Sequence, residues 1–136
     1  MTIVSHSAEQ TEAIAAEFAQ KLRGGECIAL HGQLGAGKTQ FVRGLVAGLG
    51  GDVRSVSSPT YILLNLYDSG RLTLFHLDAY RVGGAEDFEA IGFSELLEQG
   101  GVVVVEWASR IAEALPADCM QVSIEHIGPQ QRRIEL

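Results

Sequence analysis

The chain has 136 residues, and its 10 Lys and Arg against 17 Asp and Glu give a formal net charge of −7. That length fits one domain spanning residues 1–136, and a composition that is 46% apolar and 20% charged argues against disordered, collagen-like and fibrous classes. The acidic balance also argues against direct binding of nucleic acid, which depends on Lys and Arg that neutralise phosphates.

Membrane insertion and secretion are not expected. The longest purely aliphatic run, residues 102–105, is far shorter than the ~20 residues that span a bilayer. The first residues lack a basic stretch followed by an apolar core. Cys27 and Cys119 are too few for a disulfide framework or a cysteine zinc site. We therefore expect a cytoplasmic protein that makes no contact with a membrane.

The first half of the chain alternates strand and helix patterns. Ser7 and Gln10 form a capping box that begins a helix, and Gly24 and Gly25 end that helix. The predicted elements are a strand over 2–5, a helix from 7 to about 22, a strand over 27–30, a glycine-rich loop over 32–37 and a helix over 38–49.

The second half adds a hairpin and an apolar strand. Asp68-Ser69-Gly70 is a hairpin turn between two strand patterns, and 102–107 is apolar on both faces, which is typical of a sheet interior covered by helices. The predicted elements are a loop over 50–59, strands over 61–67 and 71–77, a loop over 78–84, helices over 85–90 and 94–99, a strand over 102–107, a helix over 109–115, and strands over 121–126 and 132–136.

Residues 32–39, with the sequence GQLGAGKT, match the P-loop pattern G-x-x-x-x-G-K-[ST] in full. Glycines let such a loop wrap its N–H groups around phosphate oxygens, and the helix that follows adds the positive end of its dipole. Lys38 would reach the β- and γ-phosphates, and the Thr39 hydroxyl would bind Mg²⁺. The predicted phosphate-binding residues are Leu34, Gly35, Ala36, Gly37, Lys38 and Thr39.

A P-loop site also needs an acid at the end of a neighbouring strand to hold Mg²⁺ or to orient water. Two predicted strands are followed by, or end near, an acidic residue, Asp78 in one case and Glu106 in the other. The aliphatic run before Glu106 favours a central strand, whereas the hairpin before Asp78 favours a strand nearer the edge. Either acid can serve as the principal metal ligand, and an ordinary surface carboxylate is the alternative for both.

Other residues have two interpretations each. The stretch from Ser57 to Thr60 lies where switch loops sense a γ-phosphate, or it is a polar turn. Arg43 and Arg81 are candidates for an internal arginine finger, although solvated arginines are commoner. The remaining ambiguous residues are His76, a base or a satisfied polar side chain, and Trp107, a stacking or a packing residue.

Four motifs together resemble the bacterial threonylcarbamoyladenosine biosynthesis ATPases, the TsaE or YjeE family. They are GQLGAGKT at 32–39, SPTY at 58–61, HLDAYR at 76–81 and EW at 106–107, and the resemblance extends over about residues 5–133. Gln33, Ala79 and Ala108-Ser109 depart from the family's usual residues, and none of these departures removes a ligand.

The resemblance implies an α/β, three-layer P-loop NTPase fold, with a central mixed and largely parallel sheet, an antiparallel hairpin and helices on both faces. It implies an ATPase that uses ATP and Mg²⁺. Because the sequence has no obvious internal arginine finger, we expect this activity to be weak in the isolated protein. Its partners would be a transferase of the threonylcarbamoyl pathway and that enzyme's inactive paralogue, with tRNA reached only through them.

The same resemblance assigns roles to residues. Lys38, Asp78 and Glu106 are the expected catalytic residues, with Thr39, Glu106 and Asp78 at the metal, Thr60 in the switch loop, and Ser7 with the Gly128 turn near adenine. Two alternatives from other classes stay open: a small-molecule kinase of the P-loop class and a non-catalytic nucleotide sensor.

Overall fold

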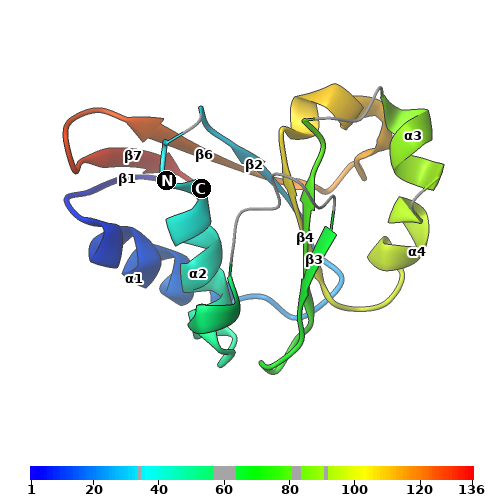
Figure 1. The fold of residues 1–136 in the computed structure, drawn as a ribbon, viewed down its shortest axis with the longest axis horizontal. Helices are drawn as coiled ribbons and strands as arrows, with labels where there is room; N and C mark the ends of the chain where they lie inside the picture. The colour runs from blue at the N-terminus through cyan, green and yellow to red at the C-terminus, as the bar shows by residue number, and fades with distance from the viewer. Residues whose placement is uncertain (34, 57–63, 81–83, 91) are drawn as a thin grey trace.

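The fold is a seven-stranded mixed sheet in the order β1-β7-β6-β2-β5-β4-β3 (Figure 1). The computed structural model describes residues 1–33, 35–56, 64–80, 84–90 and 92–136. The strands are β1 (Thr2–Ser5), β2 (Cys27–His31), β3 (Leu64–Tyr67), β4 (Leu74–Asp78), β5 (Val102–Glu106), β6 (Met120–His126) and β7 (Arg132–Glu135).

The middle of the sheet is parallel and its two flanks are antiparallel. β2 pairs in parallel with β5 and β6, and β4 with β5, whereas β1–β7, β6–β7 and β3–β4 are antiparallel. The prediction of a largely parallel sheet is therefore wrong, because the pairings divide equally. Short connections join β3 to β4 and β6 to β7, and short connections allow only antiparallel neighbours.

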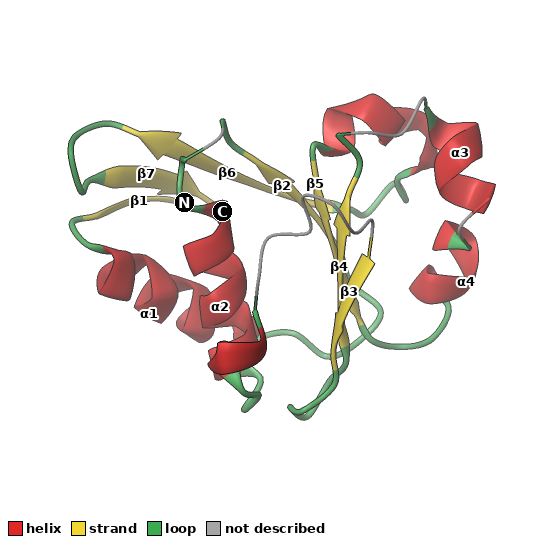
Figure 2. Ribbon diagram, viewed as in Figure 1, coloured by secondary structure: helices red, strands yellow, loops and turns green. Residues whose placement is uncertain are grey.

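Helices cover both faces of this sheet, which confirms that part of the prediction (Figure 2). The helices are α1 (Ala8–Ala19), α2 (Lys38–Gly48), α3 (Ala85–Ala90), α4 (Phe93–Leu97) and the 3-10 helices η1 (Val53–Ser55) and η2 (Ala108–Ala114). α1 and α2 pack on the face that includes Val104, and α3, α4 and η2 pack on the face that includes Val103 and Val105. None of the helices in the described part of the chain is long and apolar enough to cross a membrane.

Most predicted elements are confirmed, and their ends differ where local hydrogen bonding changes. Beyond Ala19 the amides bond to carbonyls three residues back, as Leu22 does to Ala19, so the first helix ends earlier than predicted. The predicted helix over 109–115 is the 3-10 helix η2, which is interrupted at Ile111, where φ is −126°. Residues 61–63 of a predicted strand lie outside the described residues.

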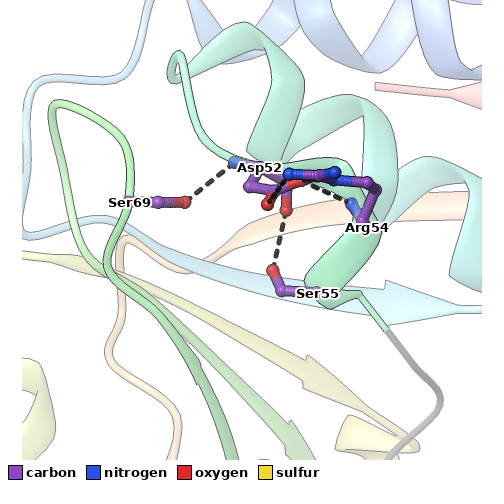
Figure 3. A network of polar contacts seen from close by, with 4 residues as sticks. All are labelled: Asp52, Arg54, Ser55 and Ser69. Carbon is purple, nitrogen blue, oxygen red and sulfur yellow. Dashed lines mark hydrogen bonds and ion pairs between the residues drawn. The ribbon is translucent and has the colours of Figure 1, made fainter.

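The hairpin between β3 and β4 is anchored to the end of α2, so β4 begins at Leu74 rather than at residue 71. The Arg71 amide donates to the Leu49 carbonyl at 2.7 Å instead of extending the strand. The Asp52 amide donates to Ser69 Oγ at 2.8 Å, and the Asp52 carboxylate accepts from the side chain of Arg54 (Figure 3). These contacts fix the end of β4 that lies away from Asp78.

The contact between α1 and α2 is made without side chains at two positions. A Cβ added to Gly44 would lie 2.3 Å from the Glu12 carbonyl oxygen, and one added to Gly48 would lie 2.3 Å from that of Ala16. The helices therefore meet backbone to backbone, and α1 is held at a fixed distance from the helix that begins at Lys38. An ion pair between Arg43 and Glu12, 3.2 Å long, adds to this seam.

We predict that Gly44→Ala destabilises the protein. In an open helix this change stabilises by roughly 0.5–1 kcal/mol, but here the new Cβ overlaps a backbone oxygen and overpacking costs about 1–3 kcal/mol. The free energy of unfolding in urea measures the difference. Gly84→Ala is the matched control, because its Cβ meets no atom within 4 Å. Equal stability of the two variants would contradict the backbone contact.

Candidate functional site

The candidate site lies at the carboxyl ends of three central strands, where α/β sheets bind ligands. β2 leads into the P-loop, β4 ends at Asp78 and β5 ends at Glu106, and the last two residues face each other in the register of β4 and β5. A cavity of about 960 Å³ opens there. Its lining consists of Ser7, Ala8, Glu9, Thr11, Gly35, Gly37, Lys38, Thr39, Gln40, Asp78, Tyr80, Glu106, Trp107, Pro129, Gln130 and Arg132.

The glycines of the P-loop lie where the backbone has a positive φ or approaches another strand too closely for a side chain. Gly35 and Gly37 have φ of 80° and 105°, in the left-handed region that favours glycine. A Cβ on Gly32 would lie 2.9 Å from the Ile124 carbonyl oxygen. Gly37 is the N-cap of α2 and supplies no side-chain cap, so the first amides of the helix face the cavity without one. This cradle fits a phosphate group.

Lys38 lies in the cavity wall with its amine held by two neighbours. Its side chain is only 7% exposed, and its Nζ is 3.6 Å from Glu106 Oε1. The same Nζ lies 4.3 Å from the centre of the Trp107 ring, within cation–π distance. These two contacts hold the amine at the mouth of the P-loop.

Glu106 is the centre of a buried polar chain. His76, which is fully buried, lies with its Nε2 2.5 Å from Glu106 Oε2, and its Nδ1 is 3.4 Å from the Tyr67 hydroxyl. Burial alone would raise the pKa of Glu106. The hydrogen bond from His76 and the charges of His76 and Lys38 outweigh burial and hold that pKa below its usual range. Glu106 is therefore ionised at neutral pH.

Asp78 has a different environment from its neighbour. Partial burial raises the pKa of Asp78, and the Glu106 carboxylate adds to this rise, while the Tyr80 amide, which donates to Oδ1 at 2.8 Å, opposes it. Two facing carboxylates with opposite pKa shifts are an arrangement that can divide metal binding and proton handling between them.

Trp107 and Tyr80 form an aromatic wall that the sequence does not predict as a pair. Their ring centres are 4.9 Å apart, and Trp107 has φ 58°, the one positive φ of a non-glycine residue in the described ranges. Such a conformation costs of order 1–3 kcal/mol and clusters at functional sites. The turn places the Trp107 ring against Lys38, and the half-buried ring also packs against the cluster that includes Val105 and Ile111. The packing interpretation of Trp107 is therefore confirmed, and stacking of its ring on a ligand stays a prediction.

The cavity brings together most of the predicted site residues. Gly35, Gly37, Lys38 and Thr39 line it with Asp78, Glu106 and Ser7, and Ser7 also accepts the Gln10 amide as the cap of α1. The side chain of Ala36 is buried in the core instead. Leu34, Thr60 and Arg81 lie outside the described residues. Arg43 does not line the cavity, because it pairs with Glu12.

Arg132 is the functional candidate that sequence reasoning missed. It is the first residue of β7, and its guanidinium lies in the cavity beside the P-loop, 3.5 Å from the Gly35 carbonyl oxygen. Nothing in its local pattern separates it from Arg133, since only the pairing of the last strand decides which arginine faces the cavity. The Pro129 and Gln130 side of the same hairpin completes that wall.

The residues fit Mg²⁺ as an ion that is bound together with phosphates. In the described ranges, no group of three or more His, Cys, Asp and Glu side chains is arranged to hold a metal alone. Mg²⁺ is usually held by one or two carboxylates plus substrate phosphates rather than by an all-protein cage. Asp78, Glu106 and the Thr39 hydroxyl supply such a partial set of oxygens around one cavity.

Comparisons with known proteins point to one family. The family model "Threonylcarbamoyl adenosine biosynthesis protein TsaE" matches residues 5–134. The tRNA threonylcarbamoyladenosine biosynthesis protein TsaE of Treponema pallidum is 41% identical over 134 residues, which cover 98% of each chain. That of Bacillus subtilis is 40% identical over 126 residues, covering 93% of this chain and 78% of that protein.

A solved structure agrees with the sequence comparisons. The crystal structure of YdiB from Bacillus subtilis superposes with a TM-score of 0.81 and 34% sequence identity, covering 98% of this chain and 82% of that one. The match therefore covers nearly the whole chain. The chain belongs to the TsaE family of threonylcarbamoyl adenosine biosynthesis proteins.

Proposed function

We propose that this protein binds and hydrolyses Mg-ATP as an accessory subunit for threonylcarbamoyl modification of adenosine in tRNA. The observation that carries the proposal is one cavity in which a P-loop, the buried amine of Lys38 and the facing carboxylates of Asp78 and Glu106 meet. These are the parts that phosphoryl-transfer sites use for positioning and for charge stabilisation.

Each residue has a proposed task. Lys38 and the amides around Gly35 and Gly37 bind the phosphates, and Thr39, Asp78 and Glu106 are the ligands of Mg²⁺. When bound, Mg²⁺ would neutralise phosphate oxygens and polarise the bond to the terminal phosphoryl group. His76 fixes the Glu106 carboxylate, so that its other oxygen stays turned toward Lys38. Ser7 and the Gly128 turn are proposed to hold the adenine, and Thr60 to sense the γ-phosphate.

The partners proposed are the transferase of the threonylcarbamoyl pathway and its inactive paralogue. The net charge of −7 disfavours direct contact with tRNA, which fits a role exercised through those partners. Hydrolysis by the isolated chain should be slow, because the sequence has no obvious internal arginine finger. Of the two arginine candidates, Arg43 is paired with Glu12. The names of the relatives favour tRNA modification over the alternative of a small-molecule kinase.

We predict that Lys38→Ala weakens ATP binding at least about tenfold, since a charge-assisted contact to phosphate contributes roughly 1.5–3 kcal/mol. Isothermal titration calorimetry with ATP and Mg²⁺ measures the change. Lys21→Ala is the matched control, because Lys21 is the chain's other lysine and is exposed. Unchanged affinity in the Lys38 variant would remove the P-loop assignment.

We predict that Glu106→Gln and Asp78→Asn lower kcat for ATP hydrolysis by about a hundredfold or more, the usual size of a lost acid–base or metal-positioning group. ATP should still bind, because the P-loop and Lys38 are unchanged. A phosphate-release assay measures kcat, with the exposed Glu113→Gln as control. Cells that depend on either acid variant should lose threonylcarbamoyladenosine, whereas full function without hydrolysis would favour the nucleotide-sensor alternative.

We predict that the protein retains the transferase and its paralogue from a bacterial lysate when ATP and Mg²⁺ are present. The Lys38→Ala variant under the same conditions is the control for nucleotide dependence, and mass spectrometry identifies what is retained. If a metabolic enzyme, or no protein, is retained instead of the transferase, the result would contradict the proposed role.

A further inference from the structure

The two cysteines of the chain lie side by side at the amino ends of neighbouring strands. Cys27 is the first residue of β2, and Cys119 directly precedes β6. In the parallel pairing of these strands Ile28 lies opposite Met120, so both cysteines stand one position before that pair. Their Sγ atoms are 3.7 Å apart, and both thiols are free. The fold therefore brings together two thiols that are 92 positions apart in the sequence.

This thiol pair is separate from the nucleotide cavity. Neither cysteine lines that cavity, which opens at the carboxyl ends of the strands. Cys27 is a buried member of the apolar cluster on the α3, α4 and η2 face of the sheet, and Cys119 packs against that cluster. β2 runs from Cys27 to the P-loop, and β6 runs from beside Cys119 to the last hairpin. A covalent link here would join the two strands that lead to opposite walls of the cavity.

The two thiols differ in exposure and in acidity. Cys27 is 3% exposed, whereas Cys119 is only half-buried. The hydrogen bond with Cys27 lowers the pKa of Cys119. The Ala29 amide lowers that pKa further, although burial and the charge of Asp118 oppose the change. The same contact between the thiols, together with burial, raises the pKa of Cys27. An accessible thiol of lowered pKa beside a second thiol is typical of redox-sensing cysteine pairs.

We propose that Cys27 and Cys119 form a redox-sensitive pair, which a peroxide oxidises to a disulfide that joins β2 to β6. The Cys119 thiolate attacks one oxygen of H₂O₂, the O–O bond breaks, hydroxide leaves, and Cys119 becomes a sulfenic acid. Cys27 Sγ then attacks Cys119 Sγ, the S–O bond breaks, and the Cys27 proton leaves with the hydroxyl group as water. In sum, two thiols are oxidised to one disulfide and one H₂O₂ is reduced to two waters.

The position of each cysteine suits its step. The half-buried Cys119 thiol is within reach of a molecule as small as H₂O₂, whereas the buried Cys27 thiol is not. Because its Sγ lies beside Cys119, Cys27 can trap the sulfenic acid before a second peroxide oxidises it irreversibly. Disulfides in reducing compartments are usually transient in this way rather than structural.

The disulfide would close a long loop that contains the P-loop, Asp78 and Glu106. Cross-links that close long loops restrict the unfolded chain the most. We therefore expect the oxidised protein to unfold about 5 °C or more above the reduced protein.

The test treats the folded chain with H₂O₂ and follows both cysteines by peptide mass spectrometry. Iodoacetamide blocks the free thiols, and trypsin then releases Cys27 in residues 24–38 and Cys119 in residues 111–132. We expect these two peptides as a linked pair, about 2 Da lighter than their sum, which dithiothreitol separates. Met120 also takes up oxygen from peroxide, so the pair is identified with or without this addition of about 16 Da.

Two variants with one cysteine each test the order of the steps. In Cys27→Ala, Cys119 should stop at the sulfenic acid, which dimedone traps, because no second thiol lies beside it. In Cys119→Ser, the buried Cys27 thiol should react with peroxide at least about tenfold more slowly, since reactivity follows exposure and thiolate character. Thermal unfolding checks that both variants are folded and measures the expected rise in the oxidised, unaltered chain.

Three results would overturn the proposal. The first is the absence of the linked peptide pair from the oxidised, unaltered chain, or its appearance only between two chains on a non-reducing gel. The second is an equal rate of oxidation in the two single-cysteine variants. The third is an unfolding temperature that the disulfide leaves unchanged or lowers. None of these measurements involves ATP, so their failure is distinguishable from failure of the proposed function.

Discussion

Glu106 places a carboxylate at the end of the central strand, where it is 5% exposed, and both of its oxygens have a cationic or polar partner. Removing one partner of a buried ion pair leaves an uncompensated charge and typically costs about 3–5 kcal/mol. The partners come from different elements, His76 from β4 and Lys38 from α2. One buried carboxylate therefore links β4, β5 and the P-loop helix. In the proposed function, a phosphate would compete with it for Lys38.

The mixed sheet explains how distant segments come to share this site. Its parallel centre brings the ends of β2, β4 and β5 to one edge, which assembles the P-loop and both acids. The last hairpin joins the sheet because β6 pairs with β2 and β7 pairs with β6. Residues about a hundred positions from the P-loop therefore form the opposite wall of the cavity. The first helix completes the enclosure, because Ser7, Glu9 and Thr11 extend from its start into the lining.

Local patterns predict the parts whose signal lies within a few residues. The P-loop spacing, the aliphatic run before Glu106 and the capping box at Ser7 each identify their element. The contribution of Arg132 and the pairing of Tyr80 with Trp107 depend on strand order and on one left-handed backbone turn, which no local spacing encodes. The predicted share of parallel strand pairs is too high for the same reason. The strands at the edges of a sheet depend on the order in which distant segments pair, which a local pattern does not contain.

The backbone contact at Gly44 and Gly48 has a mechanical consequence. Helices that slide past one another do so on layers of side chains that exchange rotamers, and this seam has no such layer where the backbones touch. We therefore expect α1 and α2 to move as one rigid body, together with the loop that cradles phosphate. Across the sheet, α3 and α4 pack through side chains such as Phe88 and Phe93, so we expect helix movements there rather than in the α1–α2 seam.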